Sequence, residues 1–449
     1  MANKVPSLQT KKSEQCKFFN YTNQACDYQV CLKAMFHRLV STMIALRSTS
    51  VLAKMSKRET VQEFEEILHW QHLILKLIGC DGYSLDFRIT SLTIVILFLA
   101  GFFVAVTFAD LYIFRDDVFN FAFVLVTIFY GIIGSTRLGY GLTRKTSFSS
   151  LMQKGRETYE QADDQQQQIL LKYTKLLKQC VTLYSLSFLG SSIMTAILPL
   201  IIHLWNGQKI LPFGVVLPFI EPTSDEGYQL NYLYQVSCIL WTPPGLTASQ
   251  NMYFVLVFNI CIQHEILIVK LDELDKLIAA NVEDSLDDEI HEMIANIVRY
   301  QQKLARFMTE VERLYSVQML VEISCNALQI VITLFVLHIV SILSRGHAEI
   351  MRLLITFYFQ DIWMPGYLII LISTFQLFIF SFMGTLIEIK SDLFCERIYG
   401  VSWHNMKNKE QKNIRFMLQQ SQRSIQLTYG GMLPLNMNLF LSVSDAYSD

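Results

Sequence analysis

Long apolar runs separated by polar links dominate this chain. A helix that crosses the roughly 30 Å hydrocarbon core of a bilayer needs about 20 mostly apolar residues, because unpaired backbone groups are too costly there. The clearest run, residues 92–109, reads LTIVILFLAGFFVAVTFA and contains no charged residue. A short link, Arg115-Asp116-Asp117, separates it from the next run at 118–134. These two runs are therefore predicted to form an antiparallel pair of membrane helices.

Further runs extend the pattern to seven predicted membrane helices. They cover about 181–205, 234–269, 317–343, 364–387 and 433–447. In the fourth helix, Pro243-Pro244-Gly245 is expected to cause a break or a kink, because two consecutive prolines remove backbone donors and clash with the preceding turn.

Few charged residues fall in or beside these runs. They are Asp110, Glu322, Asp361 and Glu388, with the pair His264-Glu265 at the inner end of the fourth helix. A charge inside a membrane span is a functional candidate by default, because it is expensive there. These charges lie near helix ends, which favours simple interfacial solvation.

The distribution of lysine and arginine predicts the orientation. Basic residues crowd the segment before the first helix and the links from second to third, fourth to fifth and sixth to seventh. The link from third to fourth has Lys209 alone, and the link from fifth to sixth has Arg345 and Arg352. Because basic residues resist translocation, the N-terminus is predicted to be cytoplasmic and the C-terminus extracellular. G-protein-coupled receptors have the opposite orientation, so the pattern argues against that class.

The basic link between the fourth and fifth helices, residues 271–314, has apolar residues at helical spacing. They are Leu274, Leu277, Met293, Ile297, Leu304, Phe307 and Val311. This stripe must be buried, and subunit assembly beneath the membrane is one way to bury it. The predicted fold class is an all-α membrane protein with seven transmembrane helices, of which helices four to six extend into a cytoplasmic anchor region.

Composition excludes several classes of function. With 52% hydrophobic and 17% charged residues, the chain of 449 residues is too apolar for an ordinary soluble core. A net charge of -2 lacks the basic field of a nucleic-acid-binding protein. Nine cysteines include no CxxC spacing, so we expect free thiols, no metal site and no cofactor. No HExxH, GxSxG, Walker or GxGxxG motif occurs, so an enzyme is not expected.

Residues 1–54 differ from the rest of the chain. They are polar and carry Lys4, Lys11, Lys12 and Lys17 without an apolar run behind them, so they do not form a cleavable signal sequence. We interpret residues 1–54 as an atypical leader and residues 55–449 as the membrane domain. The first membrane helix is then expected to act as the targeting signal.

The most informative stretch is residues 391–448, because it resembles the C-terminal signature of insect odorant receptors. The matching positions are Tyr399, Trp403, Ser421-Gln422, Gly430-Gly431, Pro434-Leu435, Phe440 and Tyr447-Ser448. The link that contains Leu211-Pro212-Phe213 and YQLNYLYQ also resembles the second outer loop of that family. The chain departs from the family at Tyr300-Gln301 and at His404, which follows Trp403. It lacks the long inner loop of the obligate co-receptor, so it resembles a ligand-tuning subunit.

This resemblance implies a mechanism. Such receptors form hetero-tetramers with the co-receptor in the plasma membrane of sensory-neuron dendrites, bind a volatile ligand in the outer half of the helix bundle and open a cation channel. The signature residues above are then expected to serve assembly. By position, the expected ligand-binding residues are Phe123, Val126, Met194, Leu198, Cys238, Met364 and Tyr367. The expected partners are therefore the co-receptor, a volatile ligand and membrane lipid, without nucleic acid.

The sequence leaves other classes of receptor open, and it also leaves the length of the seventh helix open. A gustatory-type channel would open without the co-receptor, and a transporter or a metabotropic receptor is a more distant alternative. Residues 433–447 would span about 22 Å at roughly 1.5 Å per residue, which is short for the helix that lines the family's pore. We expect that the gate segment is missing because a final exon was lost; a subunit that lines the pore poorly is the alternative.

Overall fold

A computed structural model describes residues 57–448, apart from residues 85, 208, 223, 282–284, 346–348 and 423–425. The chain separates into two compact units, Met1–Glu59 and Thr60–Asp449. The predicted leader, residues 1–54, lies outside the described residues. The helices are α2 (Lys57–Leu77), α3 (Ser91–Ile113), α4 (Val118–Thr143), α5 (Lys145–Glu160), α6 (Asp164–Asn206), α7 (Asp225–Ala280), α8 (Asp287–Arg345), α9 (Glu349–Gly400), η1 (Trp403–Asn405), α10 (Asn408–Ser421) and α11 (Met437–Ser448).

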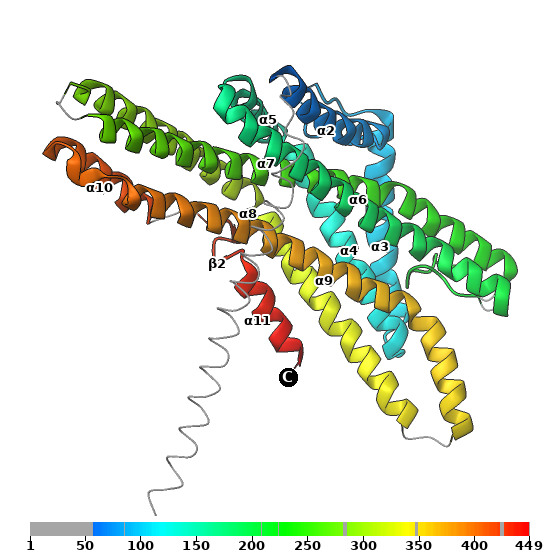
Figure 1. Ribbon diagram of the computed structural model, residues 1–449. Helices are drawn as coiled ribbons and strands as arrows, with labels where there is room; N and C mark the ends of the chain where they lie inside the picture. Colours follow the sequence, from blue (N-terminus) through cyan, green and yellow to red (C-terminus); the bar gives the residue numbers. More distant parts are fainter. Residues whose placement is uncertain are drawn as a thin grey trace, which may run out of the picture. The chain divides into compact units, whose positions relative to one another are not determined.

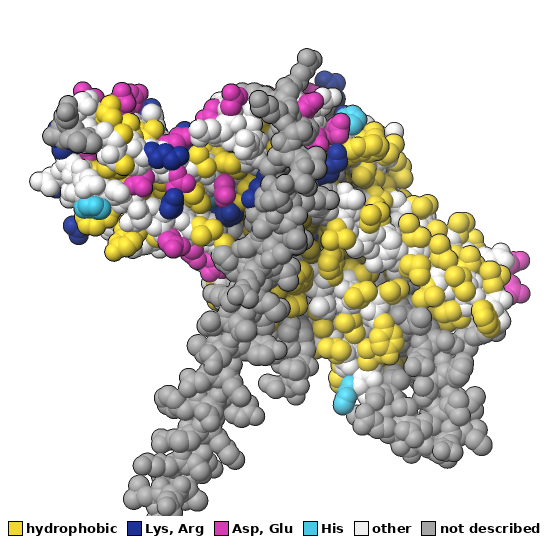
Figure 2. Space-filling view, in the orientation of Figure 1, with side chains coloured by type: hydrophobic (Ala, Val, Ile, Leu, Met, Phe, Trp, Pro, Cys, Tyr) yellow, Lys and Arg dark blue, Asp and Glu magenta, His cyan; other side chains and the backbone are white. Residues whose placement is uncertain are grey.

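Six of the described helices are long and apolar enough to cross a membrane (Figure 1). They are α3, α4, α6, α7, α8 and α9, and each contains one of the first six predicted segments. The prediction of an all-α membrane protein is thereby confirmed. Figure 2 shows hydrophobic side chains over the part of the surface formed by these helices and charged side chains gathered where α7, α8 and α10 extend beyond it.

Helix α7 is the centre of the bundle. In its most apolar window 83% of the residues are buried, against 11% in the corresponding window of α6. Helices α4, α5, α6, α8 and α9 all contact α7. Because lipid is as apolar as leucine, the exposed apolar side chains of α6 do not need protein neighbours.

The prolines of α7 do not interrupt it. A break or a kink was predicted at Pro243-Pro244-Gly245; the break does not occur, because α7 continues through these residues from Asp225 to Ala280, and a kink stays a prediction. The Thr247 hydroxyl donates to the Pro243 carbonyl at 2.8 Å. In membrane helices, neighbouring helices and hydroxyl side chains support the backbone around a proline in this way.

The extended ends of α7 and α8 bury their apolar stripe within the same chain. Leu274 and Ile297 are fully shielded, and Leu304, Phe307 and Val311 are at most 3% exposed. Helices α9 and α10 pack on these ends. Leu277 and Met293, the other two residues of the predicted stripe, are half-buried. Most of the stripe is therefore buried without a second subunit.

The predicted seventh helix differs from the structure at its start. Leu433–Pro434 form strand β2, which pairs antiparallel with β1 (Thr428–Tyr429), and α11 begins at Met437. The predicted helix start at residue 433 is therefore wrong. Gly430 and Gly431 make the turn between the strands with φ angles of 64° and 71°, values that favour glycine.

Candidate functional site

A cavity of about 180 Å³ lies between α3, α4, α6, α7 and α9. Most of its wall is apolar, which is typical of a small-molecule site. The residues that reach it from the spans include Ile96, Phe103, Tyr130, Phe188, Cys238, Trp241 and Ile372. The wall is completed from α2 and from two connecting segments, by Leu75, Ile78, Cys80, Tyr83, Pro212 and Phe213.

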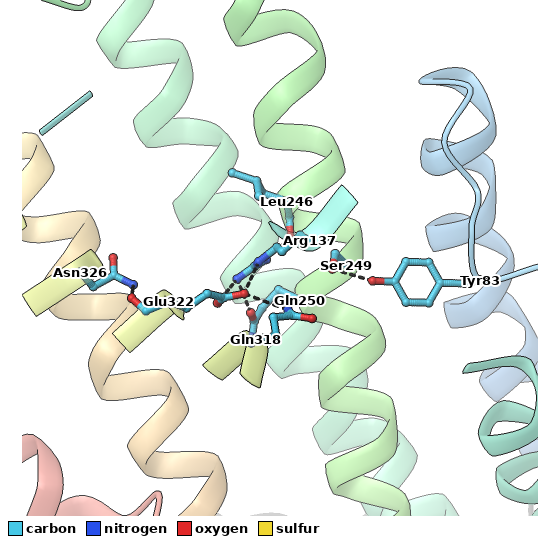
Figure 3. Close-up of polar contacts among 8 residues, drawn as sticks. All are labelled: Tyr83, Arg137, Leu246, Ser249, Gln250, Gln318, Glu322 and Asn326. Carbon is cyan, nitrogen blue, oxygen red and sulfur yellow. Dashed lines mark hydrogen bonds and ion pairs between the residues drawn. The ribbon is translucent and has the colours of Figure 1, made fainter. Parts of the chain in front are cut away.

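Arg137, which lines this cavity, belongs to a buried ion pair (Figure 3). The Arg137 guanidinium of α4 donates to both carboxylate oxygens of Glu322 on α8, from Nε and Nη2 at 2.7 Å each. The side chains are 3% and 0% exposed. Arg137 also donates to the Leu246 carbonyl at 2.6 Å and to Gln250 Oε1 at 2.8 Å, both on α7. One side chain therefore ties α4 to α7 and α8.

Further polar groups support the pair. Gln318 Nε2 donates to Glu322 Oε1 at 2.8 Å, and Asn326 donates to the Glu322 backbone carbonyl. Tyr83, before α3, shares a 2.6 Å hydrogen bond with Ser249 on α7 (Figure 3). Burial raises the pKa of Tyr83 to about 12, so its hydroxyl is neutral at physiological pH. Interfacial solvation of Glu322, as expected from the sequence, is wrong.

Asp110 is also buried, at 1% exposure, and does not face solvent as expected. Its carboxylate accepts the backbone N–H of Val216 at 2.8 Å, in the segment between α6 and α7. Gln235 accepts from the Phe213 N–H and donates to the Val215 carbonyl. Side chains of α3 and α7 thus hold the segment that carries Pro212 and Phe213 onto the cavity.

The remaining predicted membrane charges have ordinary partners or lie outside the described side chains. Glu265 accepts from Lys390 Nζ at 2.6 Å, and buried His264 contacts the Ile260 carbonyl. Glu388 is partly buried beside Asn436. The Asp361 side chain lies outside the part of the chain that the structure describes.

The predicted ligand-binding residues are spread over several places. Cys238 lines the cavity. Phe123 and Val126 are buried on α4, where the Val126 carbonyl accepts from Gln329. On α6, Met194 is exposed and Leu198 is half-buried, and Tyr367 on α9 is 51% exposed. The Met364 side chain lies outside the described part. Apart from Cys238, the described members do not line the cavity.

The signature residues extend from the end of α9 through α10 and the two strands to α11. The Gly430 N–H donates to the Ser316 carbonyl of α8 at 2.9 Å, and Ser421 accepts from Gln301 at 2.9 Å. Pro434 pairs with Thr428, and Phe440 packs edge-on against Phe378 of α9. Tyr399, Trp403 and Gln422 are exposed, whereas the side chains of Tyr447 and Ser448 fall outside the described set.

No group of three potential metal ligands occurs among the described residues. The described cysteines, including Cys80 and Cys238 at the cavity, are free. Burial raises the pKa of the Cys80 thiol to about 11. The arrangement is that of an apolar binding cavity with a polar wall.

Comparison with known families identifies the fold. Residues 117–446 match the model of the family described as 7tm odorant receptor. The chain belongs to this family. It is therefore a multi-pass membrane receptor and not an enzyme.

Individual relatives are distant. The chain is 20% identical to putative odorant receptor 83c of Drosophila melanogaster over 257 residues, which are 55% of this chain and 59% of the relative. It is 21% identical to odorant receptor 10 of Aedes albopictus over 289 residues, covering 63% and 69%. With odorant receptor 30a of Drosophila melanogaster the identity is 20%, covering 54% and 58%. The chain thus spans less than two thirds of the length of two of these relatives.

Solved structures share the fold over most of the chain. The insect olfactory receptor OR5 from Machilis hrabei in complex with eugenol superimposes with a TM-score of 0.65 at 12% identity. The match covers 86% of this chain and 96% of that receptor. A second structure of OR5 from Machilis hrabei superimposes with a TM-score of 0.60 at 11% identity.

Proposed function

We propose that this chain is a ligand-tuning odorant receptor subunit. It binds a volatile, mainly apolar molecule in the cavity among α3, α4, α6, α7 and α9, and it gates a non-selective cation channel in a hetero-tetramer with the co-receptor. It acts in the plasma membrane of sensory-neuron dendrites, with a cytoplasmic N-terminus. The observation that carries this proposal is an apolar cavity inside the bundle of a chain from the odorant receptor family.

The cavity suits a volatile ligand energetically. Burial of apolar surface contributes roughly 25 cal/mol per Å², so a small odorant gains most of its affinity from the wall. Phe103, Phe188 and Ile372 supply such surface. A relative of the same fold carries eugenol in its solved complex, which supports a ligand of similar size.

A route from the cavity to α11 supports the gating role. Arg137 at the cavity is paired with Glu322 on α8. Nearer the start of the same helix, Ser316 accepts the Gly430 N–H of the turn that precedes α11. A ligand that shifts α4 relative to α8 would therefore act on the segment that leads into α11.

Co-expression with the co-receptor in a cell without endogenous odorant receptors tests the proposal. Voltage clamp during application of a broad odorant panel is expected to record currents that need both subunits and persist when G-protein signalling is blocked. Currents from this chain alone would favour a gustatory-type channel, and sensitivity to the G-protein block would favour a metabotropic receptor. Saturable uptake without current would indicate a transporter.

The ligand position is tested by two variants of α9. Ile372→Trp fills the cavity and is expected to raise the half-maximal odorant concentration at least tenfold. Tyr367→Ala changes an exposed side chain that the sequence-based interpretation placed in the pocket. A shift of the odorant profile by Tyr367→Ala, with Ile372→Trp neutral, would move the ligand site away from the cavity.

A further inference from the structure

Most of the polar side chains around the cavity already have a hydrogen-bond partner within the protein. The hydroxyls of Thr127, Ser192 and Thr195 donate to backbone carbonyls one turn earlier in their own helices. Tyr83 and Ser249 bond to each other. These groups already form hydrogen bonds within the protein. They therefore contribute little to the orientation of a bound ligand.

Trp241 is different. It lines the cavity from α7, and its indole nitrogen is buried without a hydrogen-bond partner in the part of the chain that the structure describes. An indole N–H is a donor only. A buried donor without an acceptor costs about 1–3 kcal/mol, which an acceptor atom on a bound molecule would recover.

The charge at the cavity is already compensated. Arg137, which lines the cavity, makes a two-pronged contact at 2.7 Å with Glu322 on α8, so its positive charge is already neutralised by a carboxylate. A carboxylate or an ammonium ligand would have to lose its hydration without gaining a free counter-charge. Neutral molecules avoid this cost.

We infer that the cavity selects a neutral ligand with an acceptor oxygen, such as a ketone or an ester, whose oxygen accepts the Trp241 indole N–H. The inference rests on the proposed function and names the ligand class for the same cavity. Hydrocarbons of the same skeleton lack the acceptor, and carboxylic acids and amines are disfavoured by their charge.

Matched compounds test this class. Methyl hexyl ketone is compared with octane, octanoic acid and octylamine, and acetophenone with ethylbenzene and benzoic acid, by voltage clamp of the chain co-expressed with the co-receptor. The ketones are expected to be the most potent member of each set. Trp241→Phe is expected to lower the potency of an active ketone relative to its matched hydrocarbon about threefold to tenfold, the effect of one neutral hydrogen bond, because the smaller ring changes apolar contact for both compounds and removes the N–H donor for the ketone alone.

Trp205→Phe is the matched control, because Trp205 is 86% exposed and lies away from the cavity lining. Surface labelling verifies that both variants reach the membrane. If Trp241→Phe does not reach the membrane, the ligand class is decided by the potency ranking of the matched compounds on the unmodified chain.

The outcomes separate this inference from the proposed function. If a broad panel evokes currents but the hydrocarbons or acids equal the ketones, the ligand class is wrong and the receptor role stands. An unchanged ketone-to-hydrocarbon ratio in Trp241→Phe would likewise overturn the role of Trp241. If no compound of the broad panel evokes a current or displaces another ligand, the proposed function itself fails.

Discussion

Arg137 and Glu322 carry opposite charges in a part of α4 and α8 that is almost fully shielded from solvent. Their charges lose hydration on folding, and the two-pronged hydrogen bond with support from Gln250 and Gln318 offsets that loss. Such a pair stabilises one arrangement of the three helices it joins, because either charge alone would be buried without a partner.

Glu322→Gln should therefore destabilise the receptor strongly. Removing one partner of a buried pair typically costs about 3–5 kcal/mol. Glu310→Gln is the control, because the Lys154–Glu310 pair is 35% and 46% exposed and should contribute about 0–1 kcal/mol. Thermal unfolding of the purified receptor in detergent measures both variants. Equal melting temperatures for the two would contradict the assigned role of the pair.

The thiol of Cys80 offers a pH-dependent probe of the cavity. Burial raises its pKa to about 11, so the reactive thiolate is scarce at neutral pH and increases about tenfold with each unit of pH below that value. We expect modification by N-ethylmaleimide to accelerate accordingly as pH rises, and a bound odorant to slow it. Mass spectrometry of the Cys80 peptide, with Cys80→Ser as the blank, gives the rate of modification. A rate independent of pH would contradict the raised pKa of the Cys80 thiol.

Helix α9 and the turn before α11 approach each other closely at Gly384. A Cβ atom there would lie 1.6 Å from the Leu435 carbonyl oxygen. The next residue, Thr385, accepts the Met437 N–H at 2.8 Å, and Gly430 bonds to α8. The start of α11 is thus fixed between α8 and α9.

Gly384→Ala should separate α9 from this turn, because backbone cannot yield as a flexible side chain would. We expect a clear loss of odorant-evoked current or of surface expression. Gly101→Ala on α3 is the matched control, since a Cβ there meets no atom within 4 Å and alanine favours a helix. Current density normalised to surface labelling is the measurement; normal currents from Gly384→Ala would rule out the close contact.

At the scale of the molecule, the six long apolar helices among the described residues and the basic links between them define a membrane topology. Charged side chains gather where α7, α8 and α10 extend, as Figure 2 shows. Water solvates these charges and lipid covers the apolar remainder, so the proposed cytoplasmic side is the side with the extended helices.

Cysteine labelling in intact cells tests this orientation. Glu226→Cys, near the start of α7, should react with a membrane-impermeant maleimide from outside. Lys409→Cys, on α10, should react after permeabilisation alone. Both side chains are exposed in the chain. The reverse pattern would invert the proposed topology.

Sequence-based prediction succeeded where the physical signal is local. An apolar run such as residues 92–109 indicates a membrane helix by its own composition, whatever surrounds it. Helices α2 and α5 were not predicted, because neither has an apolar run long enough to span a bilayer. On α2, Phe64, Ile67 and Leu68 nevertheless recur at helical spacing. The start of α11 was misplaced because strand pairing at Leu433 depends on Thr428-Tyr429.

The sequence by itself determined the all-α membrane fold, the six long spans and, through the signature that ends at Ser448, a resemblance to odorant receptors. The tertiary structure decided the cavity and its chemistry. Arg137 and Glu322 are 185 positions apart in sequence, so neither reveals the other as its partner. Whether the Trp241 nitrogen has an acceptor depends on every helix around it. Hydropathy is a property of each residue, whereas pairing and burial are properties of its neighbours in space.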